Sequence, residues 1–305
     1  MSKVVKEYFE YQNKFLKKYG KDTIVLMQVG SFYEFYGLDI EKLSYKEVDA
    51  SLDLDNTHLY TVAKLLGFSI AQKTNNVLMA GVPKYAIEKH IKKLLDNNYT
   101  IIIIEQIGDD KKDVDRKITN IYSPGTYLED INSSHNNFLL SIYIENTPTL
   151  NNNLLEIGIS CIDLSIGTNI IYEIPYKKED PNYIIDELYR FVNSYNPKEV
   201  IVYFNNVEQK LQTQIITSLD IDERLVKQVN YDTHYRKLEV QEIMLQEIFK
   251  PNCMTSVFEY LNIERLQIGV YSYIHLLLFI KEHDNSKLLN LEKPTIYTNN
   301  EILKL

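Results

Sequence analysis

The chain of 305 residues contains no tryptophan and only two cysteines. Cys161 and Cys253 are too few for a disulfide scaffold and show no metal-ligand spacing. The six histidines are scattered and form no His-rich cluster. These absences argue against a disulfide-stapled domain or a structural metal site, and they indicate a reducing, intracellular compartment.

Targeting and membrane signals are also missing. Charged side chains interrupt any apolar stretch within the first ten residues, so no secretory signal is predicted. The most apolar helix-like run, 266–280, is interrupted by Gln267, Ser272 and His275 and is too short to span a bilayer. No membrane partner is therefore expected. The bias toward Tyr, Ile, Asn and Lys is typical of an AT-rich coding sequence, as in an organelle, a symbiont or a large DNA virus.

The charge is unevenly distributed along the chain. The net charge is −9, but residues 1–126 hold 18 Lys+Arg against 17 Asp+Glu, whereas residues 127–305 hold 15 against 25. The first part can therefore carry a basic face, and the second part would repel a polyanion. This asymmetry favours nucleic-acid contact in the first part and protein contact in the second.

Length and hydrophobic periodicity predict two α/β domains. In the first domain, helices are predicted at 4–19, 57–66 and 85–95, with strands at 23–28, 31–36, 68–72, 100–105 and 117–122. A linker follows to about residue 137. In the second domain, strands are predicted at 138–144, 154–163, 167–174 and 200–204, with helices at 180–192 and 207–216. From about Glu239 to His283 the pattern is helical.

The segment Met27 to Tyr36 is the most informative stretch of the first domain. Alternation along a strand places Phe32 and Glu34 on one face and Tyr33 and Phe35 on the other, where they are expected in the core. An apolar ring can wedge between stacked bases, and a neighbouring carboxyl group can hydrogen-bond an unpaired base edge. Taken alone, the segment is also compatible with an ordinary core aromatic beside a solvated charge.

Three further motifs follow in order: Leu78 to Pro83, Ile104 to Asp109, and Arg116-Lys117 leading to Ser123-Pro124-Gly125-Thr126. With the first segment, they resemble the N-terminal part of MutS, the DNA mismatch-repair sensor. That family carries a Gly-Asp-Phe-Tyr-Glu motif, a Met-Ala-Gly-Ile-Pro-like turn, Cys-Glu-Gln-x-x-Asp and Thr-Pro-Gly-Thr. The resemblance is strong over 23–126 and weaker over 138–305.

The resemblance implies a mixed α/β mismatch-recognition domain at 1–126, a linker at 127–137 and an RNase H-like connector domain at 138–260. A short helical C-terminal segment at 261–305 would begin the core and lever region. In the family, the phenylalanine of Phe-x-Glu stacks on a mispaired base from the minor groove, and the glutamate hydrogen-bonds that base. Phe32 and Glu34 occupy those positions, and the expected partner is double-stranded DNA with mismatches or small loops.

Cations near these motifs are candidates for phosphate contacts. They are Lys84, Lys89, Arg116 and Lys117. Gly81 and Pro83 are expected to fix a turn. Two departures from the family pattern stand out: Ser31 replaces the usual Asp, and the segment 37–56 is longer than expected. Neither removes the Phe-x-Glu pair.

Two alternative functions concern the second domain. Asp163, at a strand end before a glycine turn, is placed like a metal-binding Asp of an RNase H-like nuclease, but two-metal chemistry needs further carboxylates. Only Asp186 and Glu187 are obvious helpers, and both lie in an ordinary amphipathic helix. The other alternative is a protein-docking module; the resemblance implies contact with a MutL-like partner through the connector.

The sequence contains no Gly-x-x-x-x-Gly-Lys-Ser/Thr phosphate loop. MutS proteins hydrolyse ATP in a C-terminal domain that also dimerises them, so the chain is interpreted as an N-terminal fragment of a longer ATPase. We expect it to be non-catalytic, without cofactor or metal, monomeric and weak on DNA. ATP and Mg²⁺ would belong to the C-terminal domain, and the intact protein would be a dimer.

Overall fold

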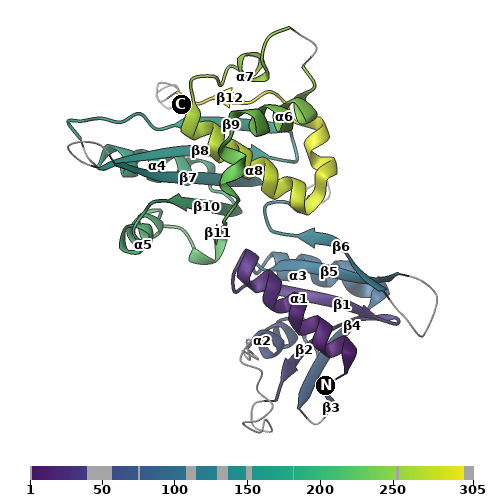
Figure 1. Cartoon of the computed structure of the whole chain (residues 1–305). Helices are drawn as coiled ribbons and strands as arrows, with labels where there is room; N and C mark the ends of the chain where they lie inside the picture. The colour runs from purple at the N-terminus through teal and green to yellow at the C-terminus, as the bar shows by residue number, and fades with distance from the viewer. Residues whose placement is uncertain are drawn as a thin grey trace. The chain divides into compact units, whose positions relative to one another are not determined.

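The computed structural model describes residues 2–39, 57–74, 76–107, 115–128, 137–148, 153–180, 182–251 and 254–298. The chain divides into two compact units, Met1–Pro124 and Gly125–Leu305 (Figure 1). Each unit contains a six-stranded mixed sheet with helices on its faces. The predicted α/β class is therefore confirmed, whereas the four domain assignments made from the sequence stay predictions.

The first unit is built on a sheet with the strand order β3-β4-β2-β1-β5-β6. The strands are β1 (Thr23–Val29), β2 (Phe32–Leu38), β3 (Ala71–Thr74), β4 (Val77–Pro83), β5 (Thr100–Ile107) and β6 (Asp115–Tyr122). The helices are α1 (Lys3–Tyr19), α2 (Thr57–Leu66), the short 3-10 helix η2 (Lys84–Ala86) and α3 (Ile87–Leu95). Only β1 and β5 pair in parallel; the other neighbours are antiparallel.

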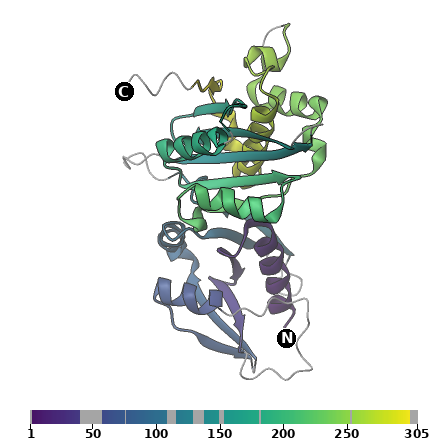
Figure 2. The same cartoon turned by 90° about the vertical axis from the view of Figure 1, so that its left-hand side faces the viewer.

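Helices cover both faces of this sheet. Figures 1 and 2 show α1 on one face and α2 with α3 on the other. Consecutive residues of β1 and β5 are therefore buried, because neighbouring side chains point to opposite faces. Buried Gln12 of α1 donates to the carbonyl of Thr23 at 2.7 Å and accepts from the N–H of Val25 at 2.8 Å. Backbone groups at the start of β1 are thereby satisfied by a helix side chain.

The segment at Gly81 and Pro83 is a strand, not the turn predicted from the sequence. Strand β4 runs through both residues and pairs with β2, so that Gly81 stands opposite Glu34 and Pro83 opposite Phe32. Pro83 is the last residue of β4, a position where a strand tolerates proline. The chain turns after it, in η2. The long segment 37–56 falls outside the described residues from residue 40 onward.

The second unit has the strand order β11-β10-β7-β8-β9-β12. Its strands are β7 (Phe138–Pro148), β8 (Asn153–Asp163), β9 (Thr168–Glu173), β10 (Glu199–Asn205), β11 (Val226–Gln228) and β12 (Thr295–Ile296). Strands β7, β8 and β9 form an antiparallel meander, and β10 and β11 continue the sheet in parallel from β7. The α-helices are α4 (Tyr183–Tyr195), α5 (Gln209–Ser218), α6 (Leu238–Phe249), α7 (Val257–Tyr260) and α8 (Gln267–Asp284), with 3-10 helices η3 (Glu223–Leu225), η4 (Thr233–Arg236) and η5 (Asn285–Asn290).

Alternation along β7 separates two cores. Ile142 faces a cluster that includes Phe191 of α4, whereas Tyr143 faces Ile268 and Tyr271 of α8. The helical pattern predicted for 239–283 is realised as three helices, because α6 ends at a left-handed residue followed by a proline. No helix among the described residues is long and apolar enough to cross a membrane.

A buried histidine of α8 makes the stability of the second unit pH-dependent. His275 is 3% exposed and packs against the rings of Tyr143, Tyr203 and Tyr231. Burial, followed by the charge of Arg236, lowers its pKa to about 3. An unfolded histidine titrates near 6.5, so below that pH the unfolded chain takes up a proton that the buried ring does not. The unfolding free energy of the second unit is therefore highest above that pH and falls as the pH falls.

We therefore expect the unfolding free energy to fall by about 2 kcal/mol between about pH 7 and pH 5 through this residue. Urea unfolding at several pH values, followed by circular dichroism, measures the slope of the unfolding free energy against pH. In His275→Phe, which keeps a ring but does not titrate, the fall between pH 7 and pH 5 should be smaller by that amount. The same slope in both proteins would contradict the assignment.

Candidate functional site

Four strands of the first unit begin or end at the same end of its sheet, and this row of strand ends is called the edge below. The parallel β1 and β5 finish there, β4 finishes beside them, and β2 starts there after the two-residue turn Gly30-Ser31. The turn is anchored by glutamines: the Gln28 amide donates to the carbonyl of Gly30 at 3.0 Å, and Gln106 accepts from the N–H of Gly30 at 3.3 Å. The first residue of β2, Phe32, is thus held at the end of the sheet by a short, braced hairpin.

Phe32 projects from this edge. Phe32 is 45% exposed, whereas Tyr33 and Phe35 on the opposite face are buried, as the alternation along the strand predicted. A large apolar ring exposed to this extent costs free energy in water unless a partner covers it. The ring of Phe32 therefore lies where a ligand could contact it without any rearrangement of the strand.

Glu34 lies on the same face as Phe32 but turns inward. It is 7% exposed, and its Oε2 accepts from the hydroxyl of Tyr36 at 2.5 Å and from the ammonium of Lys73 at 2.9 Å. Burial, followed by the hydrogen bond to Glu34, raises the pKa of Tyr36, so its phenol is a neutral donor. The carboxylate is therefore paired within the unit and not solvated.

A second polar cluster occupies the other face at the same end of the sheet. Glu105 of β5 accepts from the Tyr33 hydroxyl at 2.6 Å and pairs with the ammonium of Lys84 at 3.3 Å. The hydrogen bond from Tyr33, and then Lys84, lower the pKa of Glu105. Lys84, one of the predicted phosphate contacts, is half exposed but already faces a carboxylate.

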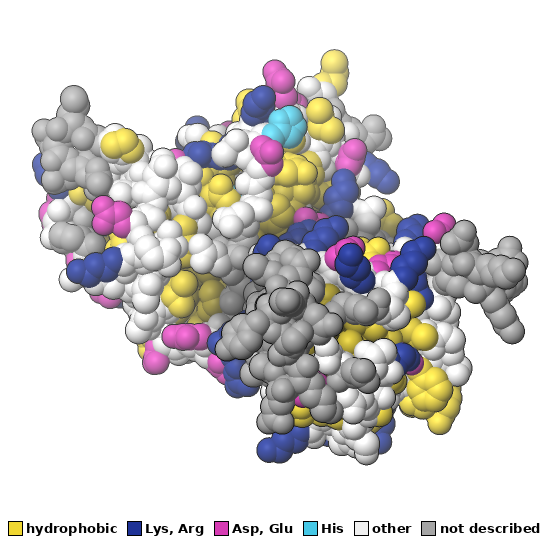
Figure 3. All heavy atoms as spheres, turned by 60° about the horizontal axis from the view of Figure 1, so that its bottom comes forward, with side chains coloured by type: hydrophobic (Ala, Val, Ile, Leu, Met, Phe, Trp, Pro, Cys, Tyr) yellow, Lys and Arg dark blue, Asp and Glu magenta, His cyan; other side chains and the backbone are white. Residues whose placement is uncertain are grey.

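The other predicted cations differ in their surroundings. Lys89 of α3 and Lys117 of β6 are exposed, and Lys117 stands opposite Glu105 in the sheet. The side chain of Arg116 is only 6% exposed and donates to Glu7 of α1 at 2.9 Å, which indicates a structural role. On the face drawn in Figure 3, Lys and Arg side chains lie among Asp and Glu side chains.

Sequence reasoning missed three residues of the candidate site. Tyr85 of η2 is 92% exposed and comes two residues after Pro83, the neighbour of Phe32. Ile107, at the end of β5, is 50% exposed. Lys73 reaches Glu34 from another strand. An aromatic residue directly after Pro-Lys was a visible signal for Tyr85, whereas only the folded sheet brings Lys73 to Glu34.

Asp163 of the second unit has structural hydrogen bonds. Its carboxylate accepts from the N–H of Asn137 at 3.3 Å and from the N–H of Ser165 at 2.9 Å, and also from the Ser165 hydroxyl. Glu187 instead accepts from Tyr172 and Arg190 within and beside α4. Across the described ranges, no group of three His, Cys, Asp or Glu could hold a metal ion. The geometry gives the nuclease alternative no support.

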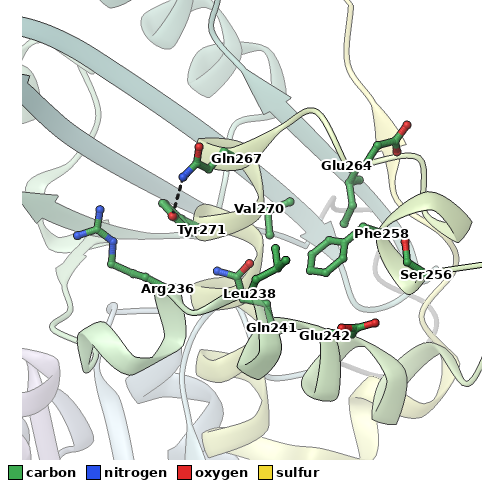
Figure 4. A pocket seen from close by; sticks show the side chains of 11 residues that line it. Arg236, Leu238, Gln241, Glu242, Ser256, Phe258, Glu264, Gln267, Val270 and Tyr271 are labelled. Carbon is green, nitrogen blue, oxygen red and sulfur yellow. Dashed lines mark hydrogen bonds between the residues drawn. The ribbon is translucent and has the colours of Figure 1, made fainter.

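The second unit also contains a pocket of about 500 Å³ between α6, α7 and α8 (Figure 4). Leu238, Phe258 and Val270 supply apolar lining, and the amide of Gln267 donates to the hydroxyl of Tyr271 at 2.9 Å. Neither Asp163 nor Asp186 nor Glu187 lines it. The carboxylates that line the pocket, Glu242 and Glu264, are therefore not those of the nuclease alternative.

The motif Ser123-Pro124-Gly125-Thr126 ends in a buried, hydrogen-bonded position of the second unit. The N–H of Gly125 donates to Glu199 at 3.0 Å, and the ammonium of Lys287 donates to the carbonyl of Thr126. These contacts give Gly125 and Thr126 a structural role in the second unit that involves no ligand.

Comparison with known proteins gives consistent matches. The family model for MutS domain I matches residues 8–131. A DNA mismatch repair protein mutS homolog of Acanthamoeba polyphaga mimivirus is 29% identical over 332 residues, covering 98% of this chain and 28% of that protein. The DNA mismatch repair protein MutS of Caldanaerobacter subterraneus is 26% identical over 297 residues, covering 96% of this chain and 30% of that protein. The MutS of Thermodesulfovibrio yellowstonii is 30% identical over 194 residues, covering 61% and 18%.

The chain spans less than a third of the length of these relatives. The domain I match includes the edge that carries Phe32 and Glu34, and MutS proteins align over nearly the whole chain. The chain is therefore similar to MutS proteins over nearly its whole length, and its first unit matches MutS domain I.

Proposed function

We propose that this chain recognises mispaired or unpaired bases in double-stranded DNA, with Phe32 as a stacking wedge and Glu34 as the hydrogen-bonding partner of the displaced base. The observation that carries the proposal is a 45% exposed phenylalanine, on the same strand face as a carboxylate two residues away, at the open end of a rigid sheet. Its position within a MutS domain I match supports the same role.

Discrimination would come from deformability of the DNA. Inserting a side chain between base steps costs a few kcal/mol of unstacking and kinks the duplex by roughly 20–90°. A mismatch or an unpaired base lowers this cost, because its stacking and pairing are already poor. A wedge therefore gains more at a defect than in matched DNA, without reading a particular sequence.

The surrounding cations would hold the phosphate backbone. Lys84, Lys89 and Lys117 are exposed and remain proposed contacts, and exposed Tyr85 is added to them as a ring that can lie against sugar or phosphate. Arg116 is omitted, because Glu7 already neutralises its part-buried guanidinium.

For the second unit we propose the RNase H-like connector role. An antiparallel meander, β7-β8-β9, followed by helices alternating with the parallel strands β10 and β11, supports this assignment. Helix α8 packs on the same sheet, so residues up to 284 are structurally part of this unit. The unit would relay the state of the DNA site to an ATPase domain and contact a MutL-like partner.

The intact protein, as proposed, is a dimeric ATPase that uses ATP and Mg²⁺ in a C-terminal domain outside this chain. The relatives are about three times as long as the chain, which leaves room for such a domain. The chain by itself would then bind DNA without catalysis.

Fluorescence anisotropy with two labelled duplexes tests the proposal. One duplex carries a single unpaired thymine, and the other is fully matched. At low salt we expect tighter binding to the duplex with the unpaired thymine than to the matched duplex. The Glu34→Ala variant should remain folded but lose this preference. Equal affinity for both duplexes, falling in parallel as salt is added, would mean that only the cations engage the backbone and would overturn the proposed recognition.

A further inference from the structure

The carboxylate of Glu34 is held by one oxygen only. Oε2 accepts from Tyr36 at 2.5 Å and from Lys73 at 2.9 Å, whereas no hydrogen bond reaches Oε1 from the described residues. We propose that Lys73 and Tyr36 are positioning residues that occupy Oε2 of Glu34 and leave Oε1 as the hydrogen-bond acceptor for the displaced base. This inference rests on the proposed function.

The sheet builds this arrangement with three devices. Tyr36 follows Glu34 by two residues and so shares its face. Lys73 is the extra residue of a β-bulge, because the β3–β4 register passes from Gln72 opposite Leu78 to Thr74 opposite Val77. Bulges re-aim side chains, and this one directs the ammonium of an edge-strand lysine to a carboxylate on β2.

The third device is Gly81, which stands opposite Glu34. A Cβ atom at this position would lie 3.4 Å from Cγ of Glu34 and 3.0 Å from the carbonyl oxygen of Tyr33. The 3.0 Å contact is the tight one, so a larger residue at this position would press on the β2 backbone beside Glu34. The ammonium also lies 5.9 Å from the centre of the Tyr36 ring, so the three groups form one compact cluster.

The cluster fixes the orientation of the Glu34 carboxylate. An ammonium ion and a phenol hydroxyl both donate to Oε2, and hydrogen bonds that involve a charged partner are short and strong. Near the DNA backbone, the lysine also offsets the repulsion between the carboxylate and the phosphates. An ionised carboxylate can only accept hydrogen bonds.

An obligate acceptor selects among bases. The minor-groove edges of paired A and T offer acceptors, which would repel Oε1, and only guanine adds an N–H donor. A displaced thymine or guanine presents a ring N–H on its pairing edge, whereas cytosine presents an unprotonated ring nitrogen there and carries its amino donor on the major-groove side. The Lys73–Tyr36–Glu34 cluster should therefore favour an unpaired thymine over an unpaired cytosine.

The test is a double-mutant cycle on the full chain, with duplexes containing one unpaired thymine, one unpaired cytosine or no defect. In the wild type, we expect tighter binding to the unpaired thymine than to the unpaired cytosine at neutral pH. In Lys73→Met, the ratio of these two affinities should fall by roughly tenfold, because the charged hydrogen bond that orients the Glu34 carboxylate is lost. Lys73→Arg should restore it.

In Glu34→Gln, adding Lys73→Met should leave the ratio unchanged. If Lys73→Met instead weakens all three duplexes by one factor and the ratio persists, Lys73 is only a backbone cation and the inference is overturned. Tyr36→Phe, which removes one donor and keeps the ring, provides a second reading if Lys73→Met does not fold. A wild type that binds all three duplexes equally would instead refute the proposed function itself.

Discussion

The Gly158→Ala variant is expected to lose at least about 3 kcal/mol of the stability of the second unit, at the upper end of overpacking costs. A Cβ atom on Gly158 of β8 would lie 2.1 Å from the carbonyl oxygen of Ile268 and 2.7 Å from the nitrogen of Gly269. Both are backbone atoms at the start of α8, so no rotamer change relieves the clash. Helix α8 would have to move off the sheet, and with it the buried Tyr143–Tyr271 contact.

A thermal melt followed by circular dichroism measures the effect, and a unit of this size should melt roughly 6–12 °C lower. Gly269→Ala is the matched control. Its Cβ would meet only the side chains of Ile171, Leu266 and Glu173, at 3.0 Å or more, and alanine is the better helix former. An equal loss in both variants would contradict the close backbone approach of α8 to β8.

The Phe32→Ala variant is expected to lose preference for defective DNA by about 5- to 150-fold, because stacking of a base on an aromatic ring contributes about 1–3 kcal/mol. The residue is 45% exposed, so its removal should cost little stability. The affinity ratio of duplexes with and without an unpaired thymine measures the loss.

Tyr85→Ala is the matched control for Phe32→Ala, since Tyr85 is an exposed ring near the same edge, 92% exposed. It should weaken both duplexes alike and preserve their ratio. A larger change of the ratio in Tyr85→Ala than in Phe32→Ala would transfer the wedge to Tyr85.

Alternation along β2 could be predicted from the sequence, because apolar and polar residues of a half-buried strand follow its two faces. It placed Tyr33 and Phe35 in the core, where the structure has them. The pairing of Glu34 with Lys73 could not be predicted, since it depends on a bulge 39 residues further along the chain. A bulge shifts the register without leaving a hydrophobic period to read.

Local chemistry also misled the prediction at Gly81 and Pro83, which read as a turn. The strand extends to Pro83 because pairing with β2 is set by the whole sheet, and because proline is tolerated where the strand ends. The surroundings of Arg116 could not be predicted either. Glu7 of α1, more than one hundred residues earlier, pairs with it.

The central claim is that the ring of Phe32 enters the base stack at a defect. The most direct measurement places the fluorescent base 2-aminopurine beside an unpaired thymine and records its emission with the protein at saturation. The account predicts a change of emission on binding of the wild type, because the wedge unstacks the neighbouring base, and little change with Phe32→Ala or in a matched duplex. The same emission change with Phe32→Ala at saturation would contradict the claim.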